Sequence, residues 1–169
     1  MNVSFAASRL QANAAAIEQL VQAVDDEQAH WQPPAQGWSI VEVINHLADE
    51  ERLDFRLRLD YALHRPGEPV PPIDPVGWVT QNAYNARPLA ASMADFLAER
   101  RASVAWLAGL RDPAWDNALH FAWGTLHAGD VLAAWIAHDS LHIRQLAELH
   151  REYVAFLAAP YRVDYAGDW

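Results

Sequence analysis

The chain has 169 residues, no cysteine, and 22 acidic against 12 basic residues, which gives a formal net charge of −10. This length is typical of one domain, and the lack of cysteine excludes disulfides, cysteine-ligated zinc, iron–sulfur clusters and a cysteine nucleophile. The acidic charge, with no stripe of basic residues, argues against nucleic-acid binding, and no apolar run reaches the roughly 18 residues that span a bilayer.

The N-terminal part of the sequence predicts one helix and then an extended connector. Apolar residues recur at three- and four-residue steps, which predicts a helix over about 4–25. The adjacent residues Pro33 and Pro34 then force the chain into an extended conformation. The first ten residues lack the basic-then-apolar layout of a secretion signal. We therefore expect a cytoplasmic protein.

A second long helix is predicted over 39–64. Ser39 and Glu42 have the spacing of a capping box, in which each side chain satisfies a free backbone amide at the start of a helix. The apolar stripe expected to face the protein interior contains Val43, Leu47, Leu53, Leu57 and Tyr61.

A proline-rich connector follows this helix. Residues 65–77 contain five prolines and two glycines, which is typical of a surface segment. A short helical piece is expected over 79–84. Pro88 suits the first turn of a third long helix, which is predicted over 88–111.

The last third of the chain predicts one more long helix. Apolar residues alternate within residues 114–127 as in a strand, but a single short strand would have nothing to pair with, so we interpret this segment as an ordered loop. A fourth helix is predicted over 128–157, followed by a tail over 158–169. Four long helices without a sheet predict an all-α four-helix bundle that forms one domain over 1–169.

The motif His138-Asp139-Ser140-Leu141-His142 is the densest chemical signal in the sequence. Two histidines four residues apart share one face of a helix and lie about 6 Å apart along its axis, so both can reach one ion. His46 lies on the interior-facing stripe of the second helix. Because three buried, unpaired imidazoles are costly and a shared cation removes that cost, we predict a divalent metal site at His46, His138 and His142.

The predicted site is open, and Glu50 is the candidate for a further role in it. Structural zinc sites usually have four protein ligands, whereas three histidines leave a position for water or substrate. Glu50 lies one turn after His46 on the same face. It could orient a histidine ligand, accept a proton or complete the coordination shell. The alternative is a partly exposed carboxylate in the acidic run Asp49-Glu50-Glu51.

Two stretches of the sequence resemble the DinB-like superfamily of metal-binding helical bundles. Residues 37–51, Gly-Trp-Ser-Ile-Val-Glu-Val-Ile-Asn-His-Leu-Ala-Asp-Glu-Glu, are similar to its second-helix motif. Residues 135–146, Trp-Ile-Ala-His-Asp-Ser-Leu-His-Ile-Arg-Gln-Leu, are similar to its last-helix motif. The resemblance extends over about 5–150.

This resemblance implies a four-helix bundle, commonly a homodimer, whose three histidines bind zinc or nickel. Carried over by position, the ligands are again His46, His138 and His142. The family implies a metal-dependent transferase or hydrolase acting on a small molecule, with a low-molecular-weight thiol as a possible cosubstrate. Any thiol nucleophile must come from outside, because the chain has no cysteine.

Parts of the sequence also match three other functions. A zinc peptidase is suggested by the pattern His138-Asp139-x-x-His142, but Asp139 is shorter than the glutamate that such enzymes use. A di-iron bundle needs Glu-x-x-His on two helices, and the only such spacing, Glu27 to His30, lies in a connector. A non-enzymatic structural or stress-response bundle, stabilised by the metal, would have its open coordination position closed by a protein group.

Overall fold

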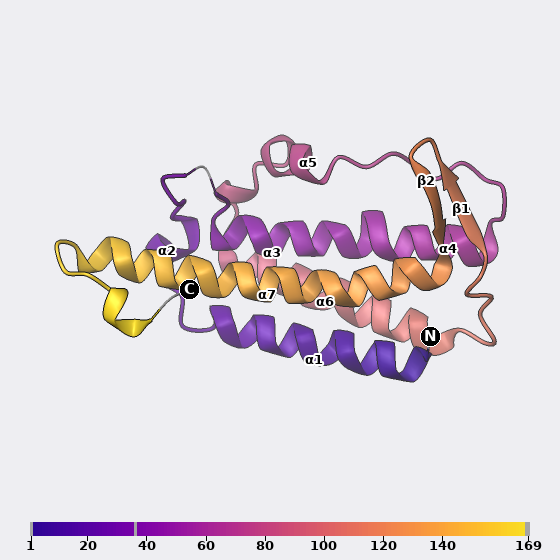
Figure 1. The fold of residues 1–169 in the computed structure, drawn as a ribbon, viewed down its shortest axis with the longest axis horizontal. Coiled ribbons are helices and arrows are strands. Elements are labelled where there is room, and N and C mark those ends of the chain that lie inside the picture. The colour runs from indigo at the N-terminus through magenta and orange to yellow at the C-terminus, as the bar shows by residue number, and fades with distance from the viewer. Residues whose placement is uncertain (1, 36, 168–169) are drawn as a thin grey trace.

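In the computed structural model, which describes residues 2–35 and 37–167, four long helical segments run side by side along the molecule (Figure 1). The segment α1 contacts α6 and α7, and the second segment contacts the same two. This arrangement confirms the predicted all-α four-helix bundle. The four segments are α1 (Val3–Val21), the continuous run of α3 (Ile40–Asp49), η1 (Glu50–Phe55) and α4 (Arg56–His64), then α6 (Leu89–Gly109) and α7 (Ala128–Ala158).

The proline-rich connector between α4 and α6 determines the topology of the bundle. It runs back along the length of the molecule and carries α5 (Pro75–Gln81) and η2 (Tyr84–Ala86) (Figure 1). Because of this long return, α6 runs parallel to α3 and α4. The predicted helical piece at 79–84 starts earlier than expected, since Asp74 accepts a hydrogen bond from the Gly77 amide and caps α5.

The first helix is shorter than the predicted 4–25. It ends at Val21, and a separate helix, α2 (Asp26–His30), follows. The reason is the side chain of Asp25, which accepts a hydrogen bond from the Gln28 amide at 2.8 Å and so begins a new helix. The third and fourth long helices agree with their predicted bounds within two residues.

The prediction of a loop over 114–127 is wrong for eight of its residues. They form an antiparallel hairpin of β1 (Ala118–Phe121) and β2 (Gly124–His127), in which Leu119 pairs with Leu126. The alternating segment does have a partner, because the chain turns back at Ala122 and Trp123 and enters the second strand at Gly124, whose φ of 152° favours glycine. The hairpin lies beside α4 and ends at His127, directly before the first residue of α7.

A π-helical segment, η1, interrupts the second long helix directly after the turn that carries His46. The Arg56 amide donates to the Glu51 carbonyl, five residues earlier. The wider turn shifts the phase of the helix. As a result the expected stripe is wrong beyond Leu47: Leu53 is exposed, Leu57 and Tyr61 are only half-buried, and Leu59 and Ala62 face the core instead.

The core has two apolar halves separated by a polar layer. One half surrounds Leu47 and Leu146, and the other surrounds Leu59 and Trp135. The layer between them draws buried polar side chains from all four long segments; they are Asn13, His46, Asp49, Glu50, Glu51, Asp54, Arg100, Ser103, Asp139 and His142. None of the helices in the described ranges is long and apolar enough to cross a bilayer.

Candidate metal centre

The polar layer brings together the three histidines that the sequence singled out. His46 projects from α3, and His138 and His142 project from successive turns of α7. One ring nitrogen of each lies within 4.8 Å of the others, close enough to share one ion. His46 and His142 are 4% and 8% exposed, whereas His138 is half-buried, so the cluster is more accessible from the side of His138.

The distance between the two histidines of α7 suits two ligands of one metal. Their Nε2 atoms lie 3.1 Å apart. Nitrogens bound to zinc at about 2.0–2.1 Å, with an angle between about 90° and 109°, are separated by roughly 2.9–3.4 Å. The pair therefore has the spacing that an ion requires, without movement of the helix.

Gln145 fixes the tautomer of His142. Its amide oxygen lies 2.7 Å from His142 Nδ1, and an amide oxygen only accepts, so Nδ1 carries the proton. The lone pair of His142 is then on Nε2, the atom that faces His138. Ligand histidines are commonly oriented by such a hydrogen bond at the other ring nitrogen.

Burial keeps the three imidazoles neutral. Desolvation, followed by the neighbouring histidines, lowers the pKa of His46 to about 3. Desolvation, followed by His142 and Arg100, lowers the pKa of His138 to about 3. Desolvation also lowers the pKa of His142. Metal binding requires neutral imidazole, so the folded chain holds its ligands in the binding form at physiological pH.

Glu50 is buried beside His46 and is not the exposed carboxylate of the alternative interpretation. It is 4% exposed, and its Oε1 lies 3.9 Å from His46 Nδ1. Both atoms are buried without a hydrogen-bond partner among the described residues. Desolvation, reinforced by Asp54, raises the pKa of Glu50 to about 8. A nearby cation would remove this penalty, and the unpartnered atoms therefore fit a bound metal ion.

Two aromatic side chains form the walls of the site. Trp38 lies 4.8 Å from the ring of His46 and is parallel to His142, and Phe55 lies 5.0 Å from the ring of His138. A cavity of about 170 Å³ is lined by Trp38 and Gln145, both of which contact ligand histidines. The two rings thus give the imidazoles apolar neighbours, whereas the lining of this small cavity includes Glu148 and Glu152 and none of the three histidines.

The acidic run after His46 is buried as a whole, which the sequence did not indicate. Asp49, Glu50 and Glu51 are all at most 4% exposed. Their side chains point in different directions. Asp49 accepts hydrogen bonds from Asn82 and Tyr84 of the connector, and Glu51 accepts from Arg100 and Trp135. Consecutive helical residues point about 100° apart, so each carboxylate meets a different part of the bundle.

The other five histidines are engaged elsewhere. His120 bonds to Thr125 in the hairpin, and His127 to Asp130 at the start of α7. His30 bonds to backbone carbonyls, His64 to Asp60, and His150 to Gln28 and the Leu20 carbonyl.

The structure does not favour the peptidase alternative. Asp139 is fully buried, and both of its oxygens accept hydrogen bonds from Arg100. Its side chain is held in the polar layer by Arg100 and by Asn13. It is therefore unavailable as a base at a water molecule beside His138 and His142.

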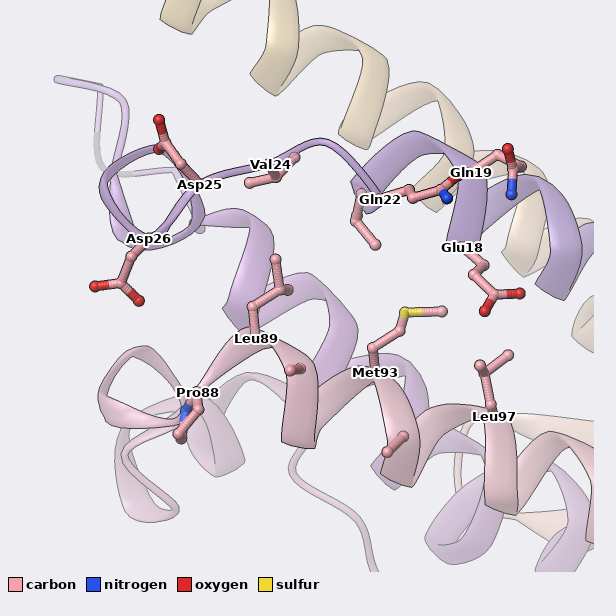
Figure 2. A pocket seen from close by; sticks show the side chains of 13 residues that line it. Glu18, Gln19, Gln22, Val24, Asp25, Asp26, Pro88, Leu89, Met93 and Leu97 are labelled. Atoms are coloured by element: carbon pink, nitrogen blue, oxygen red, sulfur yellow. The ribbon is translucent and has the colours of Figure 1, made fainter.

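A larger cavity lies away from the histidines, between α1, the start of α2 and the start of α6. It measures about 720 Å³, and Figure 2 shows Met93, Leu89 and Leu97 on its apolar side and Glu18 opposite. Asp25, on its rim, caps α2. No histidine lines this cavity, so it does not provide the substrate space of the metal centre.

Comparisons with known proteins agree with this fold. The sequence profile of the DinB superfamily matches residues 9–146, a span that contains all three histidines. The solved structure of YfiT from Bacillus subtilis is similar, with a TM-score of 0.78 and 20% identity over 89% of this chain and 87% of that one. YfiT is described as "a probable metal-dependent hydrolase with an unusual four-helix bundle topology". No curated protein is significantly similar in sequence.

Proposed function

This chain belongs to the DinB superfamily, and we propose that it is an enzyme that holds one divalent metal ion with His46, His138 and His142 and hydrolyses a small molecule. The observation that carries the proposal is the convergence of three neutral ring nitrogens within 4.8 Å, inside a layer of buried charge. The description of YfiT as a probable metal-dependent hydrolase supports the same reaction class.

The donor set supports zinc or nickel as the ion. Imidazole suits both metals, and the chain has no cysteine to favour a thiolate-bound centre. Three neutral ligands leave the charge of a divalent ion uncompensated and at least one position open. When bound, the ion would supply Lewis-acid chemistry: it would lower the pKa of a water molecule and polarise a substrate.

The side chains around the ligands have separate roles in this proposal. Glu50 is the proton acceptor, because its carboxylate is buried at the site and Oε1 has no other partner within residues 2–35 and 37–167. Gln145 holds His142 in the ligand tautomer. Trp38 and Phe55 cover the imidazoles and exclude bulk water, which strengthens electrostatic interactions inside the site.

A second candidate is an S-transferase that uses a low-molecular-weight thiol. The same uncompensated charge would favour a thiolate in the open position, and ionisation of the thiol would be promoted. Since the chain has no cysteine, the nucleophile would be a cosubstrate. Both candidates share the metal and its ligands and differ in what occupies the open position.

The visible spectrum of the cobalt-substituted protein distinguishes both enzymatic functions from a metal that has only a structural role. We expect azide or a small thiol to change the visible spectrum of the cobalt protein, and the His46→Ala variant to lose that change. A spectrum unaffected by azide, thiols and substrate-like anions would mean that the position is closed. In that case, the non-enzymatic structural bundle would be the better interpretation of this protein. A screen of small esters and amides, with and without added thiol, decides between hydrolysis and transfer.

A further inference from the structure

Arg100 occupies the centre of the polar layer. It lies on α6 and is 2% exposed. Its two terminal nitrogens donate to the two oxygens of Asp139 on α7, each at 2.7 Å, in the two-pronged geometry that suits a guanidinium and a carboxylate. Its Nε donates to Oε1 of Glu51 in η1 at 3.0 Å. One side chain thus joins three of the long segments.

The partners of Arg100 are themselves fixed by further hydrogen bonds. Trp135 Nε1 donates to Glu51 Oε1 at 2.7 Å, and Asn13 Nδ2 donates to Asp139 Oδ2 at 3.0 Å. Arg100 also donates to the Leu10 carbonyl of α1 at 2.7 Å. With α1 included, the network connects all four long segments of the bundle at one level.

The network lies directly behind the metal centre. Glu51 is the neighbour of Glu50, and Asp139 is the neighbour of His138. A helical residue and its neighbour point about 100° apart. The hydrogen bonds of Glu51 and Asp139 therefore fix how the turns that carry Glu50 and His138 are rotated about their helix axes and where they lie along them. The side chains of Glu50 and His138 themselves remain free to face the ion.

Stability alone is a poor explanation for such a network. Buried ion pairs are often no more stabilising than apolar side chains of similar volume, because desolvation offsets the attraction. Here two carboxylates share one guanidinium, and Oε2 of Glu51 is buried with no hydrogen-bond partner in the part of the chain that the structure describes. What the geometry does provide is a fixed register between η1 and α7.

We propose that Arg100 is a positioning residue for the metal centre: through Glu51 and Asp139 it sets η1 and α7 so that His46 meets His138 and His142. This inference rests on the proposed metal site. Groups that hydrogen-bond directly to metal ligands typically change metal affinity by about 10- to 100-fold, and because Arg100 acts through the neighbours of the ligands we expect the lower end of that range. Loss of Arg100 should therefore change the affinity for the ion and the coordination geometry, and it should do so at temperatures where the helices are still folded.

The test measures zinc affinity, by competition with a chelator, and the visible spectrum of the cobalt-loaded protein. Arg100→Met alone leaves two buried carboxylates without their cation and could prevent folding. The decisive protein is the triple variant Glu51→Gln, Arg100→Met, Asp139→Asn, in which all buried charges of the network are removed together. Arg101→Met, at the exposed neighbouring position on α6, is the matched control.

We expect the triple variant to be helical by circular dichroism, to bind zinc at least about tenfold more weakly and to have an altered cobalt spectrum. Arg101→Met should match the wild type in all three. Where Arg100→Met folds, weaker zinc binding supports positioning, because loss of a positive charge would by itself strengthen cation binding. Wild-type affinity and spectrum in the triple variant would overturn this inference. Failure of the wild-type protein itself to bind either zinc or nickel would instead refute the proposed function.

Discussion

Nδ1 of His46 and Oε1 of Glu50 lie 3.9 Å apart, and neither atom has a hydrogen-bond partner among the described residues. A buried polar atom without a partner is costly, and two such atoms facing each other across one helical turn indicate a site whose occupant completes it. With an ion on the imidazole, Nδ1–H could donate to the carboxylate and the carboxylate would be ionised.

The first prediction concerns Glu50. The Glu50→Gln variant should retain the metal, since three histidines remain, but turnover with any substrate found should fall by about 100-fold or more if Glu50 accepts a proton. Metal content and kcat are measured on the same sample. Wild-type turnover in Glu50→Gln would show that the carboxylate does not handle the proton.

The second prediction concerns Gln145. Gln145→Leu removes the acceptor that holds the His142 Nδ1 proton, so zinc affinity should fall by about 10- to 100-fold. Glu148→Gln, one turn further along α7 and paired on the surface with Arg144, serves as the control and should bind zinc normally. Chelator competition measures both. Equal affinities in the two variants would contradict the tautomer assignment.

The third prediction concerns how the stability of the metal-free protein changes as the pH falls below 6.5. The pKa values of His46 and His138 are about 6.5 unfolded and about 3 folded, so protons bind preferentially to the unfolded chain between these values. The contribution of the neutral histidines is complete above pH 6.5 and is lost as the pH falls toward 3. We expect the melting temperature to decrease over this window with chelator present, and less steeply in a His138→Gln variant.

The fourth prediction is that Glu50 makes the metal-free protein less stable as the pH rises, which is the opposite of the effect of the histidines. Its pKa rises from 4.5 in the unfolded chain to about 8 in the folded protein, so its contribution is present below pH 4.5 and is lost as the pH rises toward 8. Above pH 6.5, where the histidines no longer contribute a slope, the metal-free protein should lose stability as the pH increases. Thermal melts of wild type and Glu50→Gln from pH 6.5 to 8.5 test this, and the slope should be weaker in the variant.

The sequence predicted the bundle and the three histidines because both depend on local periodicity. Helical spacing fixes which residues share a face, and His138 and His142 share one whatever the rest of the chain does. His46 was found for the same reason, since it lies before η1, where the phase of the second helix is still regular.

Features that depend on distant contacts were missed. The wider turn of η1 shifted the apolar stripe beyond Leu47, and an α-helical wheel cannot represent that shift. The hairpin was missed because the partner strand, Gly124–His127, is too short and polar to be recognised before it pairs. Arg100 resembles any surface arginine in sequence, and its acidic partners Glu51 and Asp139 are 49 and 39 residues away.

The most direct test of the account is the metal content and melting temperature of the wild type, His142→Ala and His150→Ala after zinc loading and removal of free ion. We predict one zinc per chain in the wild type and in His150→Ala, and none in His142→Ala. Because an ion bound only to the native state stabilises it, chelation should lower the melting temperature of the first two by several degrees and leave His142→Ala unchanged. A full equivalent of zinc in His142→Ala, with the same response to chelator as the wild type, would contradict the three-histidine site.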